Sequence, residues 1–348
     1  MQGRPTYNHM ISFNHPEPSR KHPPTFPVFL PFQGCPGRCI YCSQNLQTGQ
    51  PSQSLSARLK NLADDLEARK KRHLPPIGLG FFGGTFTAIP REWMLRFLDV
   101  GLTYKKQGVI SHIRCSTRPD AITPDMLQIL ARAGLDMVEL GIQSFDQDIL
   151  DRALRHCDQK TALAACTMIQ EAGLELGLQM LPGLPGHNWQ TWQEDIRTCC
   201  TIRPQIIRLY PCLVLEGTVL ASWFRQGTYI PLDMEETLFQ LAWAIRQLWS
   251  HGIAVIRIGL TPEPLLLDNV LAGPWHPSLG NMVRSRALAE IIEEQVHRLG
   301  HPPRSLKVPT RYSGELWGYR KGNETRLARA GITRTMVQYT PNPFFTLQ

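Results

Sequence analysis

Residues 34–42 have the sequence Gly34-Cys35-Pro36-Gly37-Arg38-Cys39-Ile40-Tyr41-Cys42, which places three cysteines in one glycine-rich loop. Their spacing is C-x3-C-x2-C, and the residues nearby offer no fourth good ligand. Three thiolates can bind three irons of a 4Fe–4S cluster. The fourth iron then lacks a protein ligand, so a small molecule with an amine and a carboxylate can bind it. The methionine part of S-adenosylmethionine carries both groups.

Two other chemistries also use cysteines at short spacing. A structural zinc site needs four protein ligands, and the downstream candidates Ser43, Gln44 and Asn45 bind zinc poorly. A disulfide would use two of the cysteines and leave one reactive thiol. The cluster is favoured over both because the spacing and the preference of iron for soft thiolate ligands agree.

The loop, with Tyr41 before the third cysteine, resembles the signature of the radical S-adenosylmethionine (radical SAM) superfamily. Later motifs resemble the branch that contains the Elongator catalytic subunit, and the likeness covers about residues 27–260. These motifs are Phe82-Gly83-Gly84-Thr85-Phe86-Thr87, Ser116-Thr117-Arg118-Pro119-Asp120, Gly141-Ile142-Gln143-Ser144 and Met180-Leu181-Pro182-Gly183-Leu184-Pro185-Gly186.

Strand and helix patterns alternate along the first two thirds of the chain. Six strands separated by helices predict parallel βαβ units and an α/β fold. The resemblance implies a radical SAM partial (β/α)6 TIM-like barrel with a smaller C-terminal α/β extension. The predicted strands are 28–30, 77–82, 110–117, 136–143, 175–181 and 206–214, and the predicted helices are 54–72, 90–106, 124–133, 146–172 and 188–200. Further helices are predicted at 217–226, 234–251 and 282–299, with a strand at 253–259.

Three regions are predicted from composition and pattern. Residues 1–26 are rich in proline and polar residues and predict an irregular N-terminal arm. The resemblance implies that residues 27–260 form the radical SAM core. Residues 261–348 are predicted to form a C-terminal extension with a basic tail.

Four of the predicted strands carry polar residues on one face, although strands covered by helices are usually apolar on both. This face predicts a barrel lined by polar groups, which is typical of a binding site because buried polar groups need partners. A solvated antiparallel face is the alternative. The residues are Arg114, Ser116 and Arg118; Glu139, Gly141 and Gln143; Glu175, Gly177 and Gln179; and Arg208, Tyr210 and Cys212.

The resemblance implies roles for residues at the ends of these strands. Gly83 and Gly84 can adopt backbone conformations that let carbonyls approach a ligand, and the resemblance implies that they bind the ammonium of S-adenosylmethionine. Thr85 stands where the wider superfamily often has Glu. Ser116, Arg118 and Gln143 are expected to contact ribose or carboxylate, and Leu181, Pro182 and Gly183 to lie against adenine. A plain turn and internal hydrogen bonds of the barrel are the alternative explanations.

The resemblance also implies the chemistry and one partner. A reduced cluster passes an electron to the sulfonium, and the resulting 5′-deoxyadenosyl radical abstracts hydrogen from a substrate. An external one-electron donor such as flavodoxin or ferredoxin is therefore expected. The sequence has no predicted secretion signal or membrane span, which favours the cytoplasm.

Charge favours RNA as the substrate. The formal net charge is +8, and residues 301–348 carry eight Lys and Arg against two Glu. The segment Trp317-Gly318-Tyr319-Arg320-Lys321-Gly322-Asn323 mixes aromatic and basic residues suited to stacking and phosphate contact. The tail is too short for the acetyltransferase domain of Elongator relatives. A solvated terminus, an enzyme on a small metabolite, and a cluster-bearing protein like the heme chaperones are the alternatives.

Overall fold

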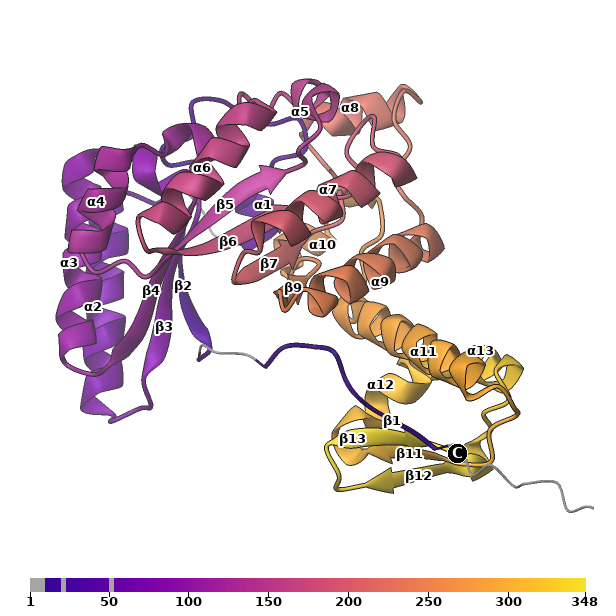
Figure 1. The fold of residues 1–348 in the computed structure, drawn as a ribbon. Helices are drawn as coiled ribbons and strands as arrows, with labels where there is room; N and C mark the ends of the chain where they lie inside the picture. Colours follow the sequence, from indigo (N-terminus) through magenta and orange to yellow (C-terminus); the bar gives the residue numbers. More distant parts are fainter. Residues whose placement is uncertain (1–9, 20–22, 50–52) are drawn as a thin grey trace, which may run out of the picture. The chain divides into compact units, whose positions relative to one another are not determined.

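The computed structural model describes residues 10–19, 23–49 and 53–348, and it divides into two compact units (Figure 1). The larger, which we call the barrel unit, comprises residues 18–234 and 251–277. The smaller, which we call the C-terminal unit, comprises residues 1–17, 235–250 and 278–348. Each unit contains residues from distant parts of the sequence, so the units do not follow the boundaries predicted after residues 26 and 260.

The barrel unit is built on seven parallel strands in the order β2-β3-β4-β5-β6-β7-β9. Its strands are β2 (Thr25–Leu30), β3 (Ile77–Gly83), β4 (Ile110–Thr117), β5 (Met137–Gln143), β6 (Glu175–Met180), β7 (Ile206–Leu209) and β9 (Ala254–Ile258). The helices of this unit are α1 (Gln44–Thr48), α2 (Leu55–Lys71), α3 (Arg91–Lys106), α4 (Pro124–Arg132), α5 (Gln147–Arg152), α6 (Gln159–Glu171), α7 (Trp189–Ile202), α8 (Val219–Arg225) and α10 (Pro264–Leu267). This arrangement is the parallel α/β partial barrel that was predicted, and the strand predicted at 253–259 becomes its seventh strand, β9.

Helices α2, α3, α4, α6 and α7 cover the outer face of this sheet (Figure 1). The strand residues that face them are apolar and buried, among them Ile113, Leu140 and Leu178. Thr123 caps α4, because its hydroxyl accepts a hydrogen bond from the Met126 amide at 3.2 Å. Burial of this outer face leaves the polar positions on the inner face of the sheet.

Two predicted elements differ from the structure. The helix predicted at 146–172 is two helices, because Leu154 has φ +49° and the Asp158 side chain starts α6 by accepting from the Thr161 amide. The strand predicted at 206–214 ends at Leu209. Its last residue, Val214, instead begins β8 (Val214–Leu215), which pairs antiparallel with β10 (Val270–Ala272).

The C-terminal unit contains a four-stranded sheet in the order β1-β13-β11-β12. Its strands are β1 (Ile11–Asn14), β11 (Leu306–Pro309), β12 (Val337–Thr340) and β13 (Phe344–Leu347), and its helices are α9 (Met234–Ser250), which begins one residue before this unit, α11 (Leu279–Leu299), α12 (Ser313–Trp317) and α13 (Glu324–Arg329). Leu288 and Ile292 of α11 pack with Leu306, Phe345 and Leu347 in one core.

The predicted irregular arm and basic tail therefore pair with each other. Strand β1 lies antiparallel to β13, with Ile11 opposite Leu347. Residues 1–9 and 20–22 of the predicted arm lie outside the described residues. The prediction missed this sheet because its two strands come from opposite ends of the chain, and no local pattern links them.

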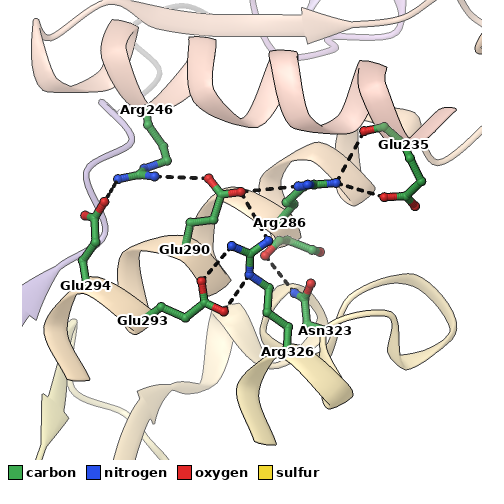
Figure 2. A network of polar contacts seen from close by, with 9 residues as sticks. Glu235, Arg246, Arg286, Glu290, Glu293, Glu294, Asn323 and Arg326 are labelled. Carbon is green, nitrogen blue, oxygen red and sulfur yellow. Dashed lines mark hydrogen bonds and ion pairs between the residues drawn. The ribbon is translucent and has the colours of Figure 1, made fainter. Parts of the chain in front are cut away.

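An ion-pair network joins α9, α11 and α13 within the C-terminal unit (Figure 2). Arg326 donates to both carboxylate oxygens of Glu293 at 2.7 Å, and it also lies 3.4 Å from Glu290. Arg286 and Arg246 bind Glu290 from the other side, at 3.3 and 3.1 Å. Part of the tail's positive charge is thus neutralised inside its own unit.

In the part of the chain that the structure describes, no helix is long and apolar enough to cross a membrane.

We predict that Phe345→Ala destabilises the C-terminal unit by about 3–5 kcal/mol, because the ring is fully buried and stacks on Phe13 at 4.9 Å. The neighbouring Phe344 is 39% exposed and provides the control, with an expected loss of about 1 kcal/mol or less for Phe344→Ala. Urea unfolding followed by circular dichroism measures both. Equal losses for the two variants would show that the strand is not packed in this register.

Candidate functional site

One large cavity lies along the inner face of the barrel sheet. Its volume is about 810 Å³, within the range of small-molecule sites. At one end it is lined by residues that follow the carboxyl ends of successive strands, where sites in α/β barrels form. Those residues include Cys35 after β2, Gly84 after β3, Arg118 after β4 and Leu181 after β6.

All three cysteines of the loop line this cavity. The loop turns directly after β2, where the Gln33 amide donates to Leu30 O and the Cys35 amide to Phe32 O, both at 3.2 Å. Phe32 and Gly34 have φ of +60° and +74°. These left-handed residues reverse the chain so that Cys35, Cys39 and Cys42 come to one side.

Each thiol has a distinct environment. The Cys35 sulfur lies 3.3 Å from the Thr85 hydroxyl, and the Cys39 sulfur lies 3.7 Å from Arg155 Nη1. Burial, and then the neighbouring Cys39, raise the pKa of Cys42 to about 12. A metal must therefore displace a proton from this thiol when it binds.

Tyr41 lines the cavity and is also packed into the core between the loop and α8. Burial, and then the adjacent Cys39, raise the pKa of its phenol well above the usual value. The ring is therefore neutral and anchors the third cysteine by packing.

The two glycines after β3 have different physical roles. Gly83 has φ +107°, a conformation open to glycine. Gly84 has no such φ, but a Cβ there would overlap the Gln33 carbonyl oxygen and lie 2.7 Å from the Gln33 nitrogen. The next residue, Thr85, donates its amide to that same carbonyl at 2.8 Å. Gly84 therefore allows the cysteine loop to lie directly on the backbone after β3.

The predicted polar contacts Ser116, Arg118 and Gln143 all line the cavity. Arg118 is already bound to Asp120 through two hydrogen bonds of 2.9 and 2.7 Å and to His156 O at 3.1 Å. Gln143 has φ +77°, unusual for a residue other than glycine, at the bulge that ends β5. Its side-chain oxygen lies 3.4 Å from Gln179 Nε2.

Only part of the predicted adenine contact faces this cavity. Leu181 lines it, whereas Gly183 lines a second cavity of about 420 Å³ beside Tyr229. The Gly183 carbonyl accepts from the Tyr229 hydroxyl at 2.6 Å, and the Pro182 carbonyl accepts from the Cys212 amide at 2.9 Å. The turn that follows β6 is thus held by Cys212 and Tyr229, which directs Pro182 and Gly183 away from the large cavity.

Sequence reasoning missed two residues that shape the cysteine loop. Gln44 is buried, accepts from the Phe32 amide and lies 4.0 Å from the Cys35 sulfur. Arg155 is buried beside Cys39 and donates to the Gly141 carbonyl. Although burial opposes its charge, Tyr41 and Cys39 raise the pKa of Arg155. The position of Gln44, two residues after Cys42, could have indicated a role in the loop. Arg155 lies 116 residues from Cys39 in the sequence, so no local pattern could have linked the two.

The inner face carries the charges that its polar pattern predicted. Glu139 is buried on β5 and binds Arg208 of β7 through hydrogen bonds of 2.6 and 3.3 Å. It also lies 3.3 Å from Arg114 of β4. The ring of Phe82 lies under both guanidinium groups, with Arg208 4.8 Å and Arg114 5.9 Å from its centroid.

The loop's donor set fits an open iron–sulfur cluster. Three thiols face one cavity, Arg155 places positive charge beside one of them, and no acidic side chain among the described residues lines the cavity. Within residues 10–19, 23–49 and 53–348, no three His, Cys, Asp or Glu side chains already lie close enough together to hold a metal ion, so the three thiols must draw together when a cluster binds. The cavity beside the thiols leaves room for a second ligand.

Comparison with known families agrees with this geometry. Residues 29–199 match the model of the radical SAM superfamily, and residues 204–288 match that of the radical SAM C-terminal domain. The chain belongs to the radical SAM superfamily. The first match begins at the end of β2 and contains the cysteine loop and β3 to β6, and the second continues through β7 and β9.

Two curated relatives illustrate the range of this superfamily. A tRNA uridine(34) acetyltransferase of Methanocaldococcus infernus is 26% identical over 68% of this chain and 52% of that protein. The heme chaperone HemW of Bacillus subtilis is 24% identical over 65% of this chain and 60% of that protein. The chain thus spans about half the length of the curated relatives it matches here.

A solved structure supports the fold. Elp3 of M. infernus with an N-terminal deletion has a TM-score of 0.58 and 21% identity, covering 84% of this chain and 68% of that chain. The predicted resemblance to Elongator-like radical SAM proteins is therefore confirmed, as are the α/β partial barrel and the radical SAM enzyme class. The family implies a 4Fe–4S cluster and S-adenosylmethionine.

We predict that Gly84→Ala lowers the iron content of the reconstituted protein, because the added Cβ must push Gln33 and the cysteine loop away. Gly37→Ala in the same loop is the control, since a Cβ there meets the His156 ring at an ordinary 3.6 Å. Iron and sulfide assays measure both variants. Full iron loading of Gly84→Ala would contradict the role assigned to this glycine.

Proposed function

We propose that this protein is a radical SAM enzyme that modifies RNA by hydrogen abstraction. The observation that carries the proposal is that Cys35, Cys39, Cys42, the Gly83-Gly84 turn and the polar ends of β4 and β5 line one cavity. A 4Fe–4S cluster bound by the three thiols would supply the electron that cleaves S-adenosylmethionine.

The residues of the chain have positioning roles in this proposal. The three cysteines hold the cluster, and Arg155 offsets negative charge at Cys39. Gly83, Gly84 and Thr85 bring backbone groups to the cavity wall beside Cys35. Ser116, Gln143 and Leu181 offer hydroxyl, amide and apolar contacts on the adjoining strands. These groups orient the cofactor beside the three thiols.

An electron donor must reach the cluster from outside. The three cysteines are partly exposed, and Arg38 between them is exposed and stacks on Phe32 at 4.4 Å. A positive charge at this edge suits a small acidic carrier such as flavodoxin or ferredoxin.

We predict that anaerobic reconstitution loads about four irons and four sulfides per chain, and that any of Cys35→Ala, Cys39→Ala or Cys42→Ala loses most of them. With dithionite, the loaded wild type should convert S-adenosylmethionine to 5′-deoxyadenosine and methionine, measured by chromatography. Cys157→Ala, outside the loop, is the control and should keep both properties. A fully loaded and active triple variant would refute the assignment of ligands.

RNA as the substrate is supported by surface charge on the C-terminal unit. Arg304, Arg311, Arg320, Lys321 and Arg329 are exposed and form no ion pair with the described residues. Arg326 is bound to Glu293, and Arg334 to Glu324 at 2.6 Å. Lys307 is half-buried on β11, so five exposed basic side chains remain for phosphate groups, fewer than the eight that the sequence offers.

Aromatic residues lie beside some of these charges. Trp317 donates its indole N–H to the Tyr339 hydroxyl at 2.9 Å, and Arg334 lies over the Trp317 ring at 5.2 Å. Tyr319 is exposed, with Arg320 5.3 Å from its ring centroid. Asn323, in contrast, is buried and donates to Ser285 O and Leu316 O, so its role is structural. The surface offers both stacking and charge to a single strand.

We predict that the double variant Arg320→Gln, Lys321→Gln binds transfer RNA more weakly than wild type. The slope of log affinity against log salt concentration should become less steep by up to about 1.4, because each lost phosphate contact contributes about 0.7. Lys70→Gln in α2 with Arg72→Gln at its C-cap removes the same charge from the barrel unit and is the control. Filter binding across a salt series gives both slopes. Slopes equal to wild type in both variants would remove RNA from the proposal and favour a small metabolite.

The similarity to a heme chaperone suggests a second candidate function, heme binding, which the same assays can detect. Stable binding of one heme, together with cofactor cleavage but no modified transfer RNA, would assign the protein to that class. Mass spectrometry of transfer RNA from cells with and without the protein distinguishes the two.

A further inference from the structure

The side chains that line the large cavity carry more positive than negative charge. Among the residues that the structure describes, six arginines and no Asp or Glu line the large cavity. Two carboxylates bind these arginines from just outside the lining, Asp120 at Arg118 and Glu139 at both Arg114 and Arg208. Arginine remains charged in proteins, so this excess of positive charge cannot be removed by loss of protons.

This positive charge is most deeply buried where Arg114, Glu139 and Arg208 form a triad. The side chains of Arg114, Glu139 and Arg208 are 9%, 4% and 16% exposed. Two guanidinium groups share Glu139, and the next carboxylate that acts on Arg114, Glu175, is bound to His112 at 2.9 Å. The triad itself therefore carries one more positive than negative charge in a poorly hydrated place. A buried charge without a counter-ion is costly.

The triad also has unused donors. Both oxygens of Glu139 are already bound by Arg208. Arg114 donates to the Thr25 hydroxyl and lies 3.3 Å from Glu139, but its Nε is buried and has no hydrogen-bond partner among the described residues. Arg114 is therefore the member whose charge is least compensated.

The triad lies away from the end of the cavity assigned to the cluster. Arg114 precedes Arg118 by four positions, about 13 Å along an extended strand. It touches Thr25, the first residue of β2, whereas the cysteine loop follows Leu30, the last. Arg118 and Arg155 at the other end are occupied by Asp120 and by Cys39 with the Gly141 carbonyl. The excess charge at the triad is thus not used by the cluster loop.

We infer that the Arg114–Glu139–Arg208 triad binds an anionic group of the substrate, a phosphate or a carboxylate, and so fixes the substrate in the barrel. The inference rests on the proposed function, because it takes the far end of the cavity as the substrate's place. Arg208 and Arg114 supply charge and planar donors, Glu139 fixes their orientation, and Tyr210, whose hydroxyl accepts from Arg208 at 3.2 Å, extends the site. The competing explanation is a structural ion network that fills the barrel.

The test measures binding rather than turnover, so it stays informative even when the wild type does not cleave S-adenosylmethionine. Full-length, cluster-loaded protein is titrated calorimetrically with methyl phosphate, acetate and the neutral acetamide. We expect saturable binding of one equivalent of at least one anion and none of acetamide. Tighter binding of methyl phosphate assigns a phosphorylated substrate such as a nucleotide, and tighter binding of acetate assigns a carboxylic acid.

Variants separate an anion site from a structural network. Arg114→Gln leaves the Arg208–Glu139 pair neutral, and we expect about a tenfold or greater loss of anion affinity, while Arg114→Lys keeps the charge and should lose less. Arg96→Gln on α3, which removes an exposed arginine paired with Glu92, is the matched control and should bind as wild type does. Circular dichroism and iron content establish that each variant is folded.

Three results would overturn the inference. These are the lack of saturable anion binding by the wild type, equal anion affinity in folded Arg114→Gln and wild type, and displacement of the anion by S-adenosylmethionine. The last result would mean that the triad holds the carboxylate of the cofactor and not a group of the substrate.

Discussion

The backbone contact between the cysteine loop and the turn after β3 is the constraint on which the site depends. Strands β2 and β3 pair in parallel, so the segments that follow them leave the sheet side by side. The Thr85 amide then donates to the Gln33 carbonyl at 2.8 Å, and Gly84 leaves no side chain between the two segments. Through this contact a loop without regular structure is positioned by the sheet. The contact between Gln33 and Thr85 therefore sets the position of the cysteines, and it brings the Thr85 hydroxyl to the Cys35 sulfur.

Charge inside the barrel divides the cavity into two regions. Near the cysteines, each buried arginine has a local partner, Asp120 for Arg118 and the Gly141 carbonyl with Cys39 for Arg155. Farther along the strands, Arg114 and Arg208 share Glu139 and retain one positive charge. Because a low-dielectric site magnifies an uncompensated charge, the second region selects for anions, whereas the first is suited to a thiolate-bound cluster.

The C-terminal unit shows how far formal charge can mislead. The last 48 residues carry a strong excess of Arg and Lys over Glu. Within the unit, however, Arg326 and Arg334 form ion pairs with Glu293 and Glu324, which neutralise their charge. The strands of this segment bury Leu306, Phe345 and Leu347 against α11. The segment is therefore a folded structure with a basic surface, and a truncation before it would expose the core of α11. Point substitutions at exposed positions are the sound way to probe it.

The sequence by itself determined the features that depend on local pattern. The cysteine spacing, the alternation of strands and helices and the inward polar face all follow from residues close together in the chain, and each shaped the fold prediction. The residues 114, 139, 143, 179 and 208 were assigned to one face because side chains alternate along a strand.

Only the tertiary structure decided the features that join distant segments. The pairing of Ile11–Asn14 with Phe344–Leu347 unites the two ends of the chain, and Arg155 reaches Cys39 across more than a hundred residues. Gly84 is required because Gln33 lies against it. Pro182 and Gly183 are directed away from the large cavity because the Cys212 amide and the Tyr229 hydroxyl bind their carbonyls. Such contacts leave no local periodicity in the sequence, since the partner of each residue is chosen by the fold.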